Sequence, residues 1–351
     1  MLQFKMIQQE EFFDILRKLP KAEIHLHLED FIAGQAAKEE HVESLSTFVT
    51  IFRQVQDSIK YIEDLEIAFR NIVRYMKNNG IVYVEVFFSP GRFLRGGWRY
   101  QDLVHFIETQ VSGIEKQDGL VIKLICDVSR SYGPEIAEEI LEQVIAHRSE
   151  DIVGIGLGGD EIIGPARDYV KIFETARRHG LKTVAHAGEA ADHQSILDAV
   201  ELLKAERIGH ATSAAQDKNT LALLVKKQIP LEIAPTSNLI TGKYVKNLKA
   251  HPVRKYLESG AFVTLNSDDP TLFNTSLLNE YWNLYCIMDN CFETLYTILR
   301  NGFLASFLTG SKKREHIRNL NRKWNRQMVL RERQKTGPWQ NMYRVVFEKS
   351  E

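Results

Sequence analysis

Short apolar runs rich in β-branched residues recur along the chain, and longer segments with helical spacing separate them. The eight predicted strands lie at 22–28, 81–88, 121–128, 152–159, 182–188, 207–211, 230–235 and 262–268. Apolar residues recur at the spacing of amphipathic helices at 61–78, 101–116, 134–147, 166–179, 194–204, 220–227 and 252–259. Several of these segments end at Gly, as helix C-termini commonly do. Alternating strands and helices predict a parallel sheet covered by helices.

Eight strands without a central break favour a closed (β/α)8 barrel of the TIM type, an α/β fold, over an open doubly wound sheet. No Gly-rich dinucleotide fingerprint follows the first predicted strand, which also disfavours the open sheet. We expect one domain over 1–351, with the barrel at about 18–310 and extra C-terminal helices at about 311–351. An insertion at 29–60 and the basic C-terminal segment stand outside the alternation. We interpret that basic segment as a solvated helical surface.

Composition narrows the class of protein. Hydrophobic residues make up 44% of the chain, charged residues 26%, and the formal net charge is −1. Such a chain offers no overall field that would attract nucleic acid or an anionic membrane. It has no apolar run long enough for a membrane span, no signal-peptide pattern, and three cysteines that cannot make a disulfide framework. We therefore expect a cytoplasmic enzyme without a nucleic-acid or membrane partner, and the sequence leaves a homo-oligomer open.

Histidines and acidic residues gather at the ends of four predicted strands. They are His25 and His27 on the first strand, His186 on the fifth, His210 on the sixth, and Asp268 with Asp269 on the eighth. A single strand-end His is equally well explained by an ordinary hydrogen bond, so the joint pattern carries the inference. Barrel strands present their C-terminal ends to one shared face, where these side chains would converge. Three imidazoles and one carboxylate suit zinc and leave a position for water.

The chemistry expected of this cluster is metal-assisted hydrolysis. A bound cation lowers the pKa of its water from about 15.7 to about 7, which provides hydroxide at neutral pH. Glu189 comes directly after the fifth predicted strand and is placed to carry a proton. The other seven histidines are interpreted as surface or packing residues: His41, His105, His147, His179, His193, His251 and His316.

Several motifs resemble those of the adenosine deaminase family and occur in the family's order. They include His25-Leu26-His27, Gly158-Gly159-Asp160-Glu161, His186-Ala187-Gly188-Glu189, Arg207-Ile208-Gly209-His210, Pro235-Thr236-Ser237-Asn238 and Asn266-Ser267-Asp268-Asp269-Pro270. The resemblance covers roughly residues 18–310 and implies a barrel enzyme that deaminates a purine.

The resemblance also implies a role for each residue. The ligands of one zinc ion per chain would be His25, His27, His186 and Asp268. Glu189 would protonate the purine at N1 while hydroxide attacks C6, and His210 would orient and assist the hydroxide. Asp269 would accept a hydrogen bond at N7, and the backbone of Gly159 would donate one to N3. The products would be the 6-oxo purine and ammonia.

Departures from the family pattern concern the substrate. Glu29 and Asp30 stand where the family often has Asp-Gly, and that Asp contacts the ribose 5′-hydroxyl in adenosine enzymes. The following segment, 31–45, is shorter than usual and would cover the sugar. Phe48 and Phe52, one helical turn apart, resemble the family's apolar lid, although a core-facing pair explains them equally well. We take Glu29, Phe48 and Phe52 as candidate substrate-binding residues.

Two further departures lie in the second and fourth predicted strands. Phe87 stands where many members have Arg, and Gly156 where adenosine enzymes have Asp. A shortened covering segment and a lost 5′-hydroxyl contact would suit a bulkier 5′ substituent. The resemblance therefore implies zinc-dependent deamination of adenosine or of a 5′-substituted adenosine such as aminodeoxyfutalosine, a small-molecule purine.

Three alternatives stay open. The substrate is free adenine, or the chain is a catalytically impaired relative that only binds. The third alternative is a two-metal hydrolase of an amide, ester or phosphoester. Relatives of that kind usually carry a bridging Lys on the fourth strand, and 152–159 contains no Lys. That difference favours a site for one ion.

Overall fold

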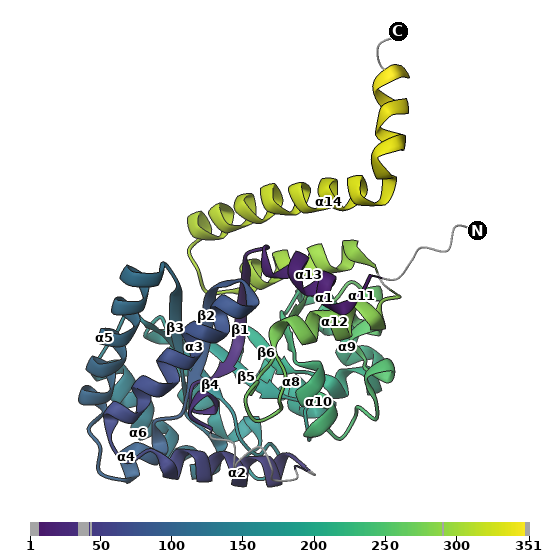
Figure 1. The fold of residues 1–351 in the computed structure, drawn as a ribbon. Helices are drawn as coiled ribbons and strands as arrows, with labels where there is room; N and C mark the ends of the chain where they lie inside the picture. The colour runs from purple at the N-terminus through teal and green to yellow at the C-terminus, as the bar shows by residue number, and fades with distance from the viewer. Residues whose placement is uncertain (1–6, 34–41, 43, 290, 348–351) are drawn as a thin grey trace.

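The computed structural model describes residues 7–33, 42, 44–289 and 291–347, with side chains described up to residue 331. Eight parallel strands form one sheet in the order β1 to β8 (Figure 1). They are β1 (Lys21–His27), β2 (Ile81–Phe88), β3 (Val121–Asp127), β4 (Ile152–Leu157), β5 (Lys182–Ala187), β6 (Arg207–His210), β7 (Leu231–Ile233) and β8 (Val263–Leu265). A parallel bridge between Leu26 and Asp268 joins the last strand to the first. The predicted barrel is confirmed.

Helices follow the strands and form the outer layer. Seven correspond to predicted segments: α3 (Leu65–Asn79), α5 (Tyr100–Asp118), α6 (Gly133–Ala146), α7 (Val170–Arg178), α8 (His193–Glu201), α9 (Lys218–Lys227) and α11 (Val253–Glu258). Four others were not predicted as helices: α1 (Gln9–Arg17), α2 (Leu45–Ser58), α4 (Gly91–Arg95) and α10 (Pro235–Ile240). The C-terminal helices are α12 (Leu277–Ile287), α13 (Phe292–Ala305) and α14 (Gly310–Phe347).

The strands are apolar on both faces because both faces are covered. Every residue of β1 is buried, and so are all but the second residue of β2 and β4. One continuous apolar cluster joins the barrel to its helices. Parallel strands enclosed in this way show near-continuous apolar runs rather than alternation. Polar side chains inside this barrel therefore need a specific explanation.

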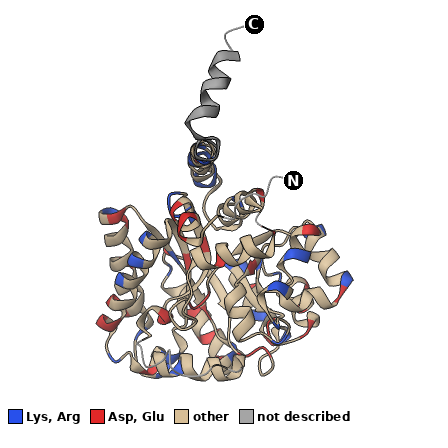
Figure 2. Cartoon of the chain, turned by 45° about the vertical axis from the view of Figure 1, so that its right-hand side comes forward, with Lys and Arg blue, Asp and Glu red and all other residues tan. Residues whose placement is uncertain are grey.

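The N-terminal end of the barrel is closed by the chain that leaves α13. Asn301 Nδ2 donates to the carbonyl of Val263 at 2.8 Å. The ring of Phe307 lies 3.9 Å from the guanidinium carbon of Arg207 on β6. Beyond this point α14 lies across α13 (Figure 1), where the ring of His316 stacks on Phe303 with centroids 5.0 Å apart, and its described part carries Lys and Arg (Figure 2). The opposite, C-terminal end of the strands is left for a site.

Helix α2 crosses that opposite end, on the far side of the molecule from α13 and α14 (Figure 1). It falls within the 29–60 insertion, of which residues 34–41 and 43 lie outside the described residues, as does His41. Asp30 is buried just before this gap and accepts from the backbone N–H groups of Thr271 and Leu272, both at 2.8 Å. The residue that departs from the family's Gly thus ties the chain after β1 to the chain after β8. In the described part of the chain, no helix combines the length and apolarity needed to cross a membrane.

Candidate active site

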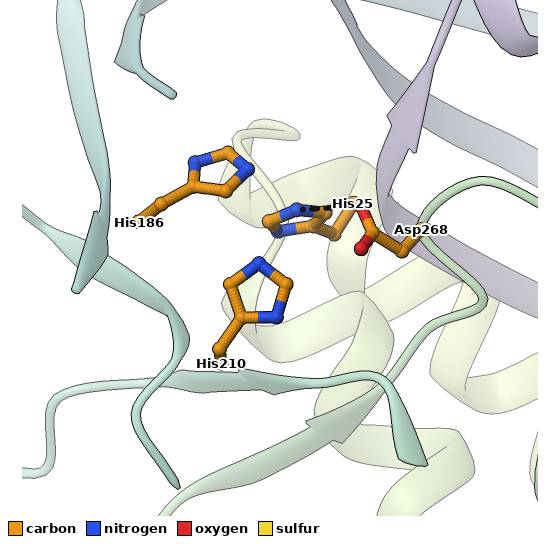
Figure 3. A group of neighbouring side chains, drawn as sticks. All are labelled: His25, His186, His210 and Asp268. Atoms are coloured by element: carbon orange, nitrogen blue, oxygen red, sulfur yellow. Dashed lines mark ion pairs between the residues drawn. The ribbon is translucent and has the colours of Figure 1, made fainter. Parts of the chain in front are cut away.

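The predicted metal-site residues lie where their strands end. His27 is the last residue of β1, and His210 is the last residue of β6. His210 and Asp268 have left-handed backbone conformations, with φ of 63° and 64°. Such conformations are costly for residues with a side chain and often mark functional sites. Figure 3 shows the side chains of His25, His186, His210 and Asp268 directed toward one another.

Distances between ligand atoms fit one metal ion. His25 Nε2 lies 3.3 Å and His27 Nε2 3.1 Å from Asp268 Oδ1. His186 Nε2 lies 3.4 Å from His27 Nε2. Ligands about 2.0–2.1 Å from a tetrahedral zinc ion are separated by about 3.3–3.4 Å. His25 Nε2 and Asp268 Oδ1 are also buried without a hydrogen-bond partner among the described residues, so the donor set fits a cation.

A second combination of ligands is also close together. His25, His186, His210 and Asp268 each offer an atom within 4.8 Å of the others, and so do His27, Asp268 and Asp269. His210 therefore competes with His27 for a place in the ligand set. Distance alone does not show whether His27 or His210 is the better metal ligand. The hydrogen bonds of His210 favour one of the two.

A chain of hydrogen bonds sets the proton position on His210. The backbone N–H of Val253 donates to His251 Nδ1 at 3.0 Å, so the hydrogen of neutral His251 lies on Nε2. That Nε2–H donates to Asn238 Oδ1 at 3.2 Å. The Asn238 amide then donates to His210 Nδ1 at 2.8 Å. His210 consequently carries its hydrogen on Nε2, and a protonated nitrogen cannot bind a metal.

Burial keeps both of these imidazoles neutral. It lowers the pKa of His251 to about 3 and the pKa of His210 to about 4. His210 Nε2 lies 3.5 Å from Glu189 Oε2 and faces the cavity as a donor. This tautomer favours His27 over His210 as the fourth ligand, and the ligand set implied by the resemblance stays a prediction. His251 is a buried partner of the site, where the sequence indicated only a packing or surface role.

Carboxylates behind His25 favour positive charge at this point. His25 Nδ1 donates to Glu232 Oε2 at 2.6 Å, which leaves Nε2 free to bind a metal. Glu232 in turn pairs with Arg207 Nε at 2.6 Å, and Arg207 pairs with Glu85. Burial alone would lower the pKa of His25, yet the nearby carboxylates of Asp268 and Glu232 raise it to about 9. Sequence reasoning missed Glu232, whose signal was an acidic residue within the apolar run at 230–235.

Glu189 lies in the cavity on a loop that another carboxylate holds. Glu161 accepts from the backbone N–H groups of Glu189 and Ala190, at 2.8 and 2.7 Å. Burial, together with the charge of Asp268, raises the pKa of Glu189 to about 8. The hydroxyl of Thr241 donates to Glu189 Oε1. The raised pKa favours the protonated form of Glu189 at neutral pH.

Two other predicted residues line the same cavity. Both carboxylate oxygens of Asp269 are buried without a partner among the described residues. Burial and the charge of Asp268 raise its pKa well above the usual range. Gly159 has φ of 95°, and a Cβ there would meet Ser131 Oγ at 3.0 Å. The left-handed backbone and the close approach both require glycine.

Helix α2 covers the cavity with one continuous face. The cavity holds about 620 Å³ of empty space, part of it open solvent, and α2 contributes Leu45, Phe48, Val49, Phe52, Arg53 and Gln56. Phe52 meets the ring of His27 edge-on, with centroids 5.8 Å apart. Phe48 packs on Phe273 at 4.9 Å. Both phenylalanines therefore line the cavity, and Phe48 packs in a small apolar cluster as well.

Glu29 lies behind the lining rather than on it. Its Oε1 accepts from Gln56 Nε2 at 3.0 Å and from the backbone N–H of Ser89 at 2.9 Å. Gln56 and Ser89 are lining residues. The second oxygen, Oε2, is buried without a partner among the described residues. A direct contact between Glu29 and a substrate remains a prediction.

The two strand departures form one structural unit. The Phe87 ring stacks on the ring of His27, with centroids 5.2 Å apart and planes at 22°. It also lies 4.8 Å from the ring of His25. A Cβ at position 156 would overlap the Phe87 ring, so Gly156 makes room for it. Phe87 therefore packs against the imidazoles of His25 and His27, and Gly156 leaves the space that the Phe87 ring occupies.

A protein-family model matches most of the chain. The model described as adenosine deaminase matches residues 30–323. The chain belongs to the adenosine deaminase family. Aminodeoxyfutalosine deaminase from Streptomyces avermitilis is 33% identical over 84% of this chain and 88% of its own length. The predicted resemblance and the predicted enzyme class, a hydrolase acting on a C–N bond, are confirmed.

Solved structures share the fold of this adenosine deaminase family member. An adenine deaminase from Arthrobacter aurescens superposes with a TM-score of 0.81 at 24% identity, over 88% of this chain and 99% of that one. An amidohydrolase from Burkholderia ambifaria with bound zinc superposes with a TM-score of 0.80 at 20% identity, over 93% and 97% of the two chains. At these identities the likeness supports the barrel alone.

Proposed function

We propose that the protein catalyses zinc-dependent hydrolytic deamination at C6 of adenosine or of a 5′-substituted adenosine, in the cytoplasm and with one zinc ion per chain. One observation carries this proposal: a cluster that could hold a cation, Glu189 with its raised pKa, and Asp269, which has no hydrogen-bond partner among the described residues, share one cavity. When bound, the ion would supply water of lowered pKa. The remaining chemistry is a matter of moving and holding protons at the purine.

Glu189 supplies the proton that the purine ring needs. Attack at C6 places electron density on N1, and a group that holds a proton at neutral pH can neutralise it. His210 presents Nε2–H to the same cavity, so it donates to the attacking oxygen and orients it. With its Nδ1 already accepting from Asn238, His210 is not available as the base.

Asp269 binds the other side of the purine ring. N7 of a purine nucleoside has a lone pair and no hydrogen, so Asp269 has to donate there. Its raised pKa provides that hydrogen. The expectation that Asp269 accepts at N7 is therefore replaced by donation. The backbone of Gly159, at the cavity wall, is free to meet N3.

The cavity favours a nucleoside over free adenine. It extends past the metal cluster to Ser89 after β2 and to Ser129 and Tyr132 after β3. Ser89 Oγ already donates to Asp127 Oδ2, so these groups do not require a ligand. Their hydroxyls can exchange hydrogen bonds with the hydroxyls of a ribose at N9, which free adenine lacks.

The decisive test is a screen for loss of the 6-amino group. Adenosine, deoxyadenosine, adenine, 5′-methylthioadenosine and aminodeoxyfutalosine are each incubated with the purified protein, and ultraviolet absorbance and ammonia are followed. We expect turnover of at least one nucleoside, and about one zinc per chain by elemental analysis. Turnover of adenine alone would replace the proposal with its main alternative. A metal-free protein that turns over none of them would be a binding relative.

A further inference from the structure

One cation in the cavity has no counter-ion among the described residues. Arg53 of α2 lines the cavity, and its Nε is buried without a hydrogen-bond partner among the described residues. Its neighbour Arg92 differs, because Arg92 Nε donates to Asp57 Oδ1 at 2.6 Å outside the lining. A buried guanidinium nitrogen left unpaired costs free energy. Arg53 is therefore a lining residue whose charge no contacting carboxylate neutralises among the described residues.

The carboxylates on this side of the cavity accept hydrogen bonds from other groups, and Glu29 Oε2 has no hydrogen-bond partner among the described residues. Asp127 Oδ1 accepts from the backbone N–H groups of Gly158 and Ser129, at 2.7 and 3.1 Å. Its Oδ2 accepts from the hydroxyl of Ser89 at 2.9 Å. Glu29 is held by two donors through Oε1. Each carboxylate fixes a loop or the end of α2, and none of them pairs with Arg53.

The surroundings of Arg53 are positive and aromatic. The guanidinium carbon of Arg95 lies 5.4 Å from the centre of the Tyr132 ring. Burial raises the pKa of Tyr132, the charges of Arg92, Arg53 and Arg95 oppose that rise, and the charge of Glu29 adds to it, so three cations and one carboxylate lie near this ring. Phe52 adjoins Arg53 in the same helix face and also lines the cavity. An anion attached to a flat or apolar group fits these neighbours.

We propose that Arg53 binds an anionic group, a carboxylate or a phosphate, carried by the N9 substituent of the substrate. The direction of that substituent rests on the proposed function, which places the purine between Asp269, Gly159 and Glu189. The guanidinium fork matches both anions with two parallel hydrogen bonds. Hydroxyls of Ser131 and Tyr132 line the same side and can complete the contact.

Binding of product nucleosides tests this subsite without relying on turnover. Inosine, inosine 5′-monophosphate and the 6-oxo product of aminodeoxyfutalosine are titrated calorimetrically into the full-length zinc-loaded protein. The readout is the preference, defined as the affinity for each anionic ligand divided by the affinity for inosine. We expect wild type to prefer one anion by more than tenfold. Arg53→Met should reduce that preference about 10–100-fold, the value of a charge-assisted hydrogen bond.

Two further variants show whether the preference depends on the charge of Arg53 itself or on the positive charge of neighbouring residues. Arg92→Met removes the adjacent ion-paired cation and should leave the preference unchanged. Arg53→Lys restores charge without the fork and should recover part of the preference. Loss confined to the carboxylate or to the phosphate arm identifies which anion the subsite takes.

The proposal is overturned if wild type shows no preference for either anion, or if Arg53→Met changes the preference less than threefold. It is also overturned if Arg92→Met has the same effect as Arg53→Met. Deamination of adenosine by wild type is measured alongside. That activity tests the proposed function alone, so failure of the subsite and failure of the chemistry give different results.

Discussion

The two sides of the barrel mouth are built in different ways. On the side of β1, β5, β6 and β8, side chains emerge from strands and are backed by buried polar chains. The facing wall of the cavity is a single helix, α2, which contacts Phe273 after β8, Asp160 after β4 and Arg92 after β2. A few hydrogen bonds and ion pairs hold this helix, among them Ser46 Oγ to Asp160 Oδ2 at 2.6 Å and the pair of Asp57 with Arg92. The strand ends hold their side chains in fixed positions. Substitutions on α2 can alter which substrate fits the cavity without moving those side chains.

This difference fits a family whose members share chemistry and differ in substrate. Placing a reacting group on a strand, with a second residue holding it, keeps its geometry within narrow limits. A helix that closes over the cavity adds contact area and can carry other residues. Mutations on the two sides should therefore change different kinetic parameters, kcat or metal content on one side and selectivity or KM on the other.

The largest effect is expected at the proton donor. Glu189→Gln keeps the shape of the side chain but removes the acidic hydrogen, so kcat should fall by about 10²–10⁴-fold. Zinc content should stay unchanged, because Glu189 is not in the ligand set. Stopped-assay kinetics and elemental analysis measure both quantities. A rate within a few-fold of wild type would show that another group donates the proton.

Metal retention should depend on the carboxylate behind His25. Glu232→Gln weakens the pull on His25 Nδ1–H and leaves Arg207 with less counter-charge. We expect zinc affinity to drop about 10–100-fold, as it does when such supporting partners are lost elsewhere. Competition with a chelator measures it. The matched control is Glu206→Gln, which removes a partly exposed ion pair between Glu206, just before β6, and Lys182 of β5. Equal affinity in both variants would contradict this role.

The proton position on His210 can be inverted with almost no change in volume. Asn238→Asp replaces a donor by an acceptor, so the hydrogen should move to His210 Nδ1. Nitrogen-15 chemical shifts of labelled His210 report that move directly. We expect kcat to fall about tenfold or more, since a wrong histidine tautomer is costly in catalysis.

The control for this exchange is Asn247→Asp, an exposed residue whose side chain caps a turn that Asp caps equally well. Its nitrogen-15 shifts at His210 should match wild type. If Asn238→Asp left the His210 spectrum unchanged, the hydrogen-bond chain from Val253 would not set the tautomer.

The smallest effect is expected on helix α2, which covers the cavity. Ser46→Ala removes the hydrogen bond between α2 and Asp160, worth about 1 kcal/mol, or roughly fivefold in affinity. KM should rise by that factor while kcat stays the same, because no reacting group moves. Thr50→Ala, exposed on the same helix, serves as the control. A fall in kcat with constant KM would mean that α2 also aligns the reacting groups.

Much of the fold and of the metal cluster could be predicted, because both leave local signals. Apolar runs and Gly-terminated helices mark the strands and helices of a barrel. The fold then brings strand ends to one rim, which is why His25, His186 and Asp268 could be grouped from positions far apart in the chain. Helix α2 escaped prediction because its apolar positions face a cavity and a small cluster, within a segment that has no neighbouring strand to frame it.

Supporting residues left weaker signals. His251 occupies a loop in the sequence, and nothing local shows that it reaches Asn238. Glu232 differs from a surface acid only by lying within an apolar strand, which predicts burial but not its partner. The coupling of Phe87 with Gly156 likewise depends on two strands meeting, and each departure by itself has no explanation.

Periodicity and motif order alone determined that this chain forms a parallel barrel with imidazoles and carboxylates at its strand ends. Only the tertiary structure placed His251 and Asn238 in a hydrogen-bond chain behind His210, and left Arg53 Nε buried without a partner among the described residues. The physical reason is that strand and helix patterns are local. Proton positions and unpaired charges depend instead on which distant donors and acceptors meet when the barrel closes.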